Sequence, residues 1–131
     1  MKKTFLHGIV AGLLAGFGSI YYSKMYFQFF EVDFSVLVNP RTIMLGSTYG
    51  TLLASLGYYL MCCFVKVHAD FLFNMTLLVM TFAAFISGFF IRLPLDMLSP
   101  ELFPWLIAPM HVLPPLFWLV MKPLFFGKNG N

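Results

Sequence analysis

A histidine among prolines in the last hydrophobic stretch is the pattern with the clearest chemical potential. Pro109, Pro114 and Pro115 surround His111. A proline inside a helix removes a backbone hydrogen bond and frees a carbonyl, which in lipid must find a partner within the protein. A broken helix that carries an ionisable side chain is typical of a membrane binding site. The alternative is a kinked helix in which His111 only donates to a freed carbonyl.

Three charged residues are expected near the depth of His111 and complete the candidate ligand-binding site. Arg41 opens the second hydrophobic segment, Arg92 closes the third, and Asp96 follows in the next connection. His111 would lie about 9 Å below the outer surface at 1.5 Å per helical residue. An ion pair between Arg92 and Asp96 that only pins the connection is the alternative interpretation. Four hydroxyl residues are expected in the same leaflet: Ser19, Ser47, Thr48 and Ser87.

The other histidines and the cysteines do not form a pattern typical of a cofactor or metal site. A haem bound by two histidines needs both ligands at one depth, whereas His7 and His68 are expected near the membrane face opposite His111. Cys62 and Cys63 are adjacent instead of being spaced as Cys-x-x-Cys, and they fall at the side expected to be reducing. We therefore predict no cofactor, no metal site and no catalytic residue.

The elements that must position these residues follow from composition. Of 131 residues, 60% are hydrophobic and 10% are charged, whereas a soluble domain averages about 25% charged residues. Lipid is the solvent that tolerates so apolar a surface. The net charge of +3 is small and scattered, which excludes the clustered basic face of a nucleic-acid-binding protein.

Four hydrophobic segments approach the roughly 20 residues that span a bilayer core. They predict an all-α fold, a polytopic bundle of four transmembrane helices that forms a single domain over residues 1–131. The connection between the second and third segments is short, so these two should form an antiparallel hairpin. The segments cover residues 5–22, 43–65, 71–91 and 105–121.

The two longer connections contain many apolar residues. Residues 24–42 are rich in aromatic side chains that suit the membrane interface, and part of this stretch is expected to form a helix on the outer surface or a cap on the bundle. Asn39 and Pro40 mark the turn into the second helix. Residues 92–104 contain three prolines, which favour an irregular path folded back onto the bundle.

Small residues recur at four-residue spacing in three of the segments. Such stripes let helix backbones approach closely in lipid, where no hydrophobic force brings helices together. Packing within the bundle is the favoured interpretation, and a seam between two copies of the chain is the alternative. The stripes are Gly8, Gly12 and Gly16, then Gly46, Gly50 and Ala54, and more weakly Ala84 and Gly88.

The distribution of lysine and arginine predicts that both termini are cytoplasmic. With this orientation five basic residues lie inside and three outside, as the positive-inside rule favours. The host membrane is expected to be a bacterial inner membrane. A cleaved signal peptide is the rival interpretation of the first segment. His7 within the apolar run favours a retained helix, and so does the run Ser-Ile-Tyr-Tyr after Gly18, which is not the polar start of a mature domain.

Several proline-centred runs resemble a pattern in one group of proteins. The runs are 94–96, 100–104, 109–111 and Pro114, together with 32–34 and 39–40. Through these runs, which extend along the whole chain, the sequence resembles a family of small uncharacterised bacterial four-helix membrane proteins. The resemblance implies an architecture and no activity.

Two functions from different classes remain open. The first is a non-enzymatic accessory or structural membrane component, which packs within itself and against a partner subunit or a second copy in the lipid bilayer. The second is the binding or transport of a small molecule or ion at an outer-leaflet site around His111. A cavity that reaches His111 would favour the second function, and a filled bundle would favour the first.

Overall fold

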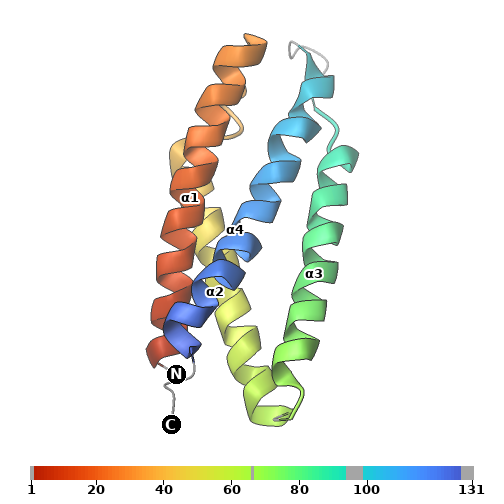
Figure 1. Cartoon of the computed structure of the whole chain (residues 1–131). Helices are drawn as coiled ribbons and strands as arrows, with labels where there is room; N and C mark the ends of the chain where they lie inside the picture. Colours follow the sequence, from red (N-terminus) through yellow and green to blue (C-terminus); the bar gives the residue numbers. More distant parts are fainter. Residues whose placement is uncertain (1, 66, 94–98, 128–131) are drawn as a thin grey trace.

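The computed structural model describes residues 2–65, 67–93 and 99–127, and these form four long helices joined by short connections (Figure 1). Two 3-10 turns, η1 (Gly88–Phe90) and η2 (Pro100–Leu102), flank the connection between the last two helices. The described residues contain no strand. The helices are α1 (Lys2–Phe30), α2 (Pro40–Phe64), α3 (Ala69–Ser87) and α4 (Phe103–Phe126).

Three of the four helical stretches are long and apolar enough to cross a membrane: Lys2–Phe30, Ala69–Phe90 and Pro100–Phe126. The second helix is 25 residues long but is not among them. Its hydroxyl residues Ser47, Thr51 and Ser55 are buried inside the protein. They lower the average hydropathy of α2 without being exposed at its outer surface.

The first helix is longer than the hydrophobic segment that predicted it. It continues as one helix to Phe30, so residues 24–30 do not form the separate surface helix that their aromatic content suggested. No glycine or proline between Ser19 and Phe30 interrupts it. The helix ends at Phe30, and the next residue, Glu31, adopts a positive backbone φ of 53°.

The glycine stripe of α1 packs directly against α2. A Cβ added at Gly8 would meet Ser55, one at Gly12 would meet Thr51 and Thr48, and one at Gly16 would meet Met44. The hydroxyl of Thr51 donates to the carbonyl of Gly8 across this contact at 2.8 Å. The stripe therefore allows close approach between the helices, as the sequence predicted for α1.

Helices α2 and α3 are close at the end where they are joined and diverge toward the other end (Figure 1). Near the α2–α3 turn, a Cβ at Gly57 would lie 3.6 Å from the ring of Phe73. Further along α2, a Cβ at Gly46 or Gly50 would meet nothing within 4 Å. The prediction that the stripe of Gly46, Gly50 and Ala54 packs within the bundle is wrong for the two glycines, because α3 diverges from α2 at their level.

The connection from α1 to α2 folds back onto the bundle. Phe34 is only 1% exposed and stacks edge-on against Phe103 of α4. The backbone amide of Ser35 donates to the Asp33 carboxylate at 2.8 Å, and hydrogen bonds from the Ser35 side chain and backbone lower the pKa of that carboxyl group. As expected, α2 begins at Pro40, with Asn39 accepting from the amide of Thr42.

The fourth helix is continuous despite its prolines. Pro109, Pro114, Pro115 and Pro123 all lie inside α4, so the chain forms the single helix expected over residues 105–121 and not the broken helix of the binding-site interpretation. Pro109 removes the amide that would bond to the carbonyl of Trp105. The hydroxyl of Tyr22, on α1, donates to that carbonyl at 2.9 Å, so a neighbouring helix satisfies the freed group.

Candidate functional site

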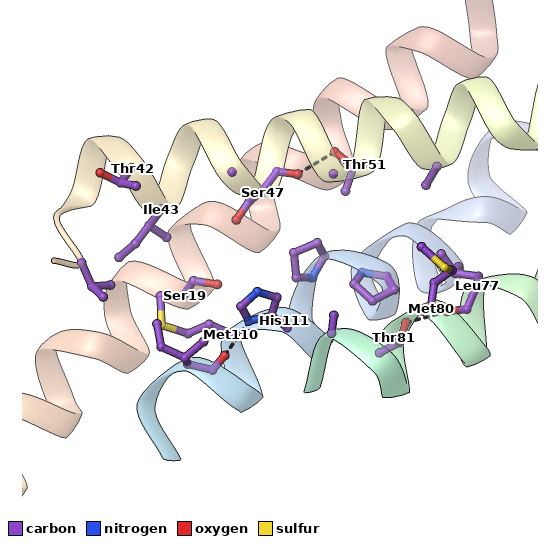
Figure 2. A pocket seen from close by; sticks show the side chains of 18 of the residues that line it. Ser19, Thr42, Ile43, Ser47, Thr51, Leu77, Met80, Thr81, Met110 and His111 are labelled. Atoms are coloured by element: carbon purple, nitrogen blue, oxygen red, sulfur yellow. Dashed lines mark hydrogen bonds between the residues drawn. The ribbon is translucent and has the colours of Figure 1, made fainter. Parts of the chain in front are cut away.

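A cavity of about 520 Å³ occupies the space where α2 and α3 diverge, with α4 forming its back wall (Figure 2). Its volume lies within the range of about 300–1,000 Å³ that is usual for small-molecule sites. Gly46, Gly50, Met80 and His111 are exposed, so the cavity is open on one side. The lining residues are Ser19, Leu37, Val38, Thr42, Ile43, Gly46, Ser47, Gly50, Thr51, Ala54, Leu77, Met80, Thr81, Ala84, Phe103, Ile107, Met110, His111, Pro114 and Pro115.

The ring of His111 projects from α4 into this cavity, toward Ser19 and Ser47 (Figure 2). Its Nδ1 lies 2.9 Å from the carbonyl oxygen of Ile107. A carbonyl can only accept, so Nδ1 carries the hydrogen and Nε2 of the neutral ring is an acceptor. The Ile107 carbonyl is not one that a proline frees, because its α-helical donor is the backbone amide of His111, four residues along. The ring is therefore fixed by its own helix and offers a free acceptor.

The backbone carbonyl of His111 is also affected by the prolines that follow it. Pro114 and Pro115 occupy the positions three and four residues ahead of it, and neither has an amide hydrogen. The carbonyl therefore lacks both the 3-10 and the α-helical donor. The adjacent prolines therefore leave the backbone of His111 with an acceptor that its own helix does not satisfy.

The hydroxyl of Ser19 is the one polar side-chain atom of the cavity that is both buried and without a hydrogen-bond partner among the described residues. Ser19 is 0% exposed, and its side chain is turned toward the side of the cavity where His111 lies (Figure 2). Three neighbouring threonines are satisfied within the protein: Thr42 by Asn39, Thr51 by Gly8 and Ser47, and Thr81 by Leu77.

The predicted site residues are only partly brought together. His111 lines the cavity, whereas Arg41 and Arg92 are exposed and are not among its lining residues. Asp96 lies outside the described residues, and so does its suggested ion pair with Arg92. Of the four hydroxyl residues expected in the same leaflet, Ser19 and Ser47 line the cavity, and Thr48 and Ser87 do not.

The opposite end of the bundle is filled by an aromatic cluster that the sequence did not reveal, made of His7, Tyr58, Phe73, Trp118 and Phe126. Trp118 is 0% exposed, and its ring lies within 5.4 Å of the rings of His7, Tyr58 and Phe73. Its indole N–H donates to the hydroxyl of Ser55 on α2 at 2.9 Å.

Polar contacts surround this aromatic cluster. Nε2 of the buried His7 donates to the carbonyl of Trp118 at 3.0 Å. At its edge, Lys122 and the hydroxyl of Tyr58 both donate to the Asp70 carboxylate, at 2.8 and 2.7 Å. Asp70 and Lys122 lie 52 residues apart, so no short-range pattern could have paired them.

Neither a metal centre nor a relative gives a further clue to function. In the described part of the chain no group of three or more His, Cys, Asp or Glu residues could hold a metal ion. No family, curated protein or solved structure matches this chain. The functional argument therefore depends on the geometry of the cavity.

Proposed function

We propose that this chain is a non-enzymatic membrane protein that binds a small molecule in the cavity around His111. The observation that carries the proposal is the cavity itself, which reaches an exposed histidine with a free ring acceptor. The proposal replaces the charged site expected from sequence by a mostly apolar one, in which His111, Ser19 and Ser47 supply the polar contacts. A concave, mostly apolar site with a few placed polar groups is typical of ligand pockets.

The proposed setting is a plasma membrane of the bacterial type, crossed by all four helices, including α2. The hydroxyl residues of α2 that lower its hydropathy are buried inside the bundle, while Leu45, Leu53 and Leu60 are exposed on its surface. Both termini would be cytoplasmic. Cys62 and Cys63 are exposed, so both are first replaced by serine. Maleimide labelling of Ser99→Cys from outside intact cells would then support this orientation. Labelling of Lys2→Cys from outside would contradict it.

Binding can be tested with lipid nanodiscs that contain or lack the protein. Radiolabelled 4-hexylphenol, a small amphiphile, is equilibrated by dialysis against both, and the excess in the protein-containing discs measures specific binding. We expect saturable excess binding to the wild-type chain. Gly50→Leu, which places a side chain into the open space, should abolish it. A chain that binds no more than empty discs would refute the proposal.

A second candidate function is an accessory subunit whose open α2 face receives a helix of a partner protein. Gly46, Gly50 and Ala54 repeat at the spacing of a helix-packing stripe, and the two glycines meet no neighbour. Purification from native membranes in a mild detergent tests this candidate. A stoichiometric companion that is lost in Gly46→Leu would favour it, and a chain that purifies alone at its monomer mass would count against it.

A further inference from the structure

We infer that the ligand of the cavity is a neutral amphiphile with a hydroxyl head and an apolar body. This inference rests on the proposed function and narrows it to a chemical class. It follows from which polar groups line the cavity, which of them are already satisfied, and which remain free.

The lack of charged side chains in the described cavity lining distinguishes a neutral ligand from a charged one. None of the lining residues found in the described chain is Asp, Glu, Lys or Arg. An ion without a partner in an apolar surrounding suffers a large desolvation penalty, so a cationic head is disfavoured, and an anionic head has no partner while the His111 ring is neutral. The hydroxyl groups of Thr42, Thr51 and Thr81 already donate to protein oxygens. They contribute no free donor that could solvate a charge.

The free polar groups match a hydroxyl. Nε2 of His111 requires a hydrogen-bond donor, since its Nδ1 already donates to Ile107. The buried hydroxyl of Ser19 has no partner and can donate to an oxygen. A ligand hydroxyl both donates and accepts, so it satisfies both kinds of group, whereas an ether or a hydrocarbon leaves Nε2 without a donor.

The rest of the cavity accommodates an apolar body. Gly46, Gly50 and Ala54 make a smooth wall on α2, and Leu77 and Met80 of α3 face the same space. The cavity is open on one side, where the two helices diverge, so a ligand dissolved in the membrane can enter without crossing water. Amphiphiles that partition into lipid therefore reach the site at high local concentration.

The test compares 4-hexylphenol with its methyl ether, 4-hexylanisole, in the nanodisc dialysis. The two probes share the ring and the chain, and only the phenol donates. We expect the phenol to bind the wild-type protein about fivefold more tightly, the ratio that one hydrogen bond of about 1 kcal/mol provides. His111→Leu should reduce the ratio to about one, and Ser87→Ala, which lies outside the cavity, should keep it.

Ser19→Ala separates a ligand contact from a structural role. Removing a buried hydroxyl that has no partner should raise the Tm of the empty protein, and it should also weaken phenol binding. If phenol and ether bind equally and Gly50→Leu abolishes the binding of both, the hydroxyl assignment is overturned and the proposed function stands. Binding of neither probe would overturn both. A lowered Tm with unchanged phenol affinity would exclude Ser19 from the site.

Discussion

The two halves of the bundle are built from the same helices but are packed in opposite ways. At the end where the α2–α3 turn lies, Phe73 closes the gap beside Gly57, and the aromatic cluster around Trp118 fills the interior. In the other half, α2 presents Gly46 and Gly50, which meet no neighbour, and a cavity of about 520 Å³ remains.

The difference shows that small residues along α2 leave a hollow only where no neighbouring helix covers them. Large rings fill the space between helices, as Tyr58 and Phe73 do in edge-on contact. Small residues permit close approach only where a partner helix is present, as between α1 and α2. Where α3 diverges from α2, the small residues Gly46 and Gly50 leave a cavity. The packed half therefore gives the bundle its stability, and the hollow half offers a site.

The largest effect is expected from Trp118→Ala, which empties the centre of the aromatic cluster. It removes a fully buried ring and its bond to Ser55, so it should destabilise the protein by about 3–5 kcal/mol. Trp105→Ala is the matched control, since this ring on the same helix is 57% exposed. Unfolding in mixed micelles would measure both. Equal losses would show that the two halves are not packed differently.

The next largest effect is expected when the same substitution, glycine to leucine, is made in each of two glycine stripes and the stabilities are compared. Gly12→Leu should overlap Thr51 and Thr48 of α2 and cost about 1–3 kcal/mol. Gly50→Leu enters open space and should leave the Tm nearly unchanged. Thermal unfolding in detergent distinguishes them. If Gly12→Leu were as stable as the wild-type protein, the first stripe would face lipid instead of α2.

A smaller effect is expected where α1 supports the proline-rich helix. Tyr22→Phe leaves the carbonyl of Trp105 without the donor that replaces the missing amide of Pro109, which should cost about 0.6 kcal/mol. In a Pro109→Ala background the helix supplies its own amide, so the cost of Tyr22→Phe should disappear. A double-mutant cycle measures this coupling. Equal costs in both backgrounds would mean that the hydroxyl does not stabilise the freed carbonyl.

The smallest effect is expected from the ion pair at the edge of the aromatic cluster. The side chain of Asp70 is 69% exposed, so Asp70→Asn should cost about 0.5 kcal/mol, as exposed pairs do. The loss should shrink further at high salt, which screens surface charges. Unfolding at low and high salt provides the measurement. A loss of several kcal/mol would place this pair inside the packed core.

Side-chain pattern predicted much of the framework because it depends on local physics. The hydrophobic segments marked the positions of the four helices, and Asn39 with Pro40 marked the start of α2. Their limits differ because helices continue past the apolar run: α1 extends to Phe30 and α4 to Phe126. The described chain is all-helical, with three helices apolar enough to span a membrane.

The candidate site could be predicted only in part. His111 was identified from its prolines, and Ser19 and Ser47 from their expected depth, and all three line the cavity. Arg41 and Arg92 were grouped with them because they begin or end a helix at the same face. Depth alone does not fix direction around a helix axis, and both arginines are exposed away from the cavity lining.

The sequence by itself determined the helical class, the apolar surface and which small residues share a helix face. Only the tertiary structure decided what each face meets: Gly12 meets α2, whereas Gly50 meets empty space. It also decided that His7 is buried beside Trp118 and that His111 is exposed. The physical reason is that helical periodicity places residues on a common face but carries no information about the distance to the next helix. That distance is fixed by side chains remote in sequence, such as Phe73 beside Gly57.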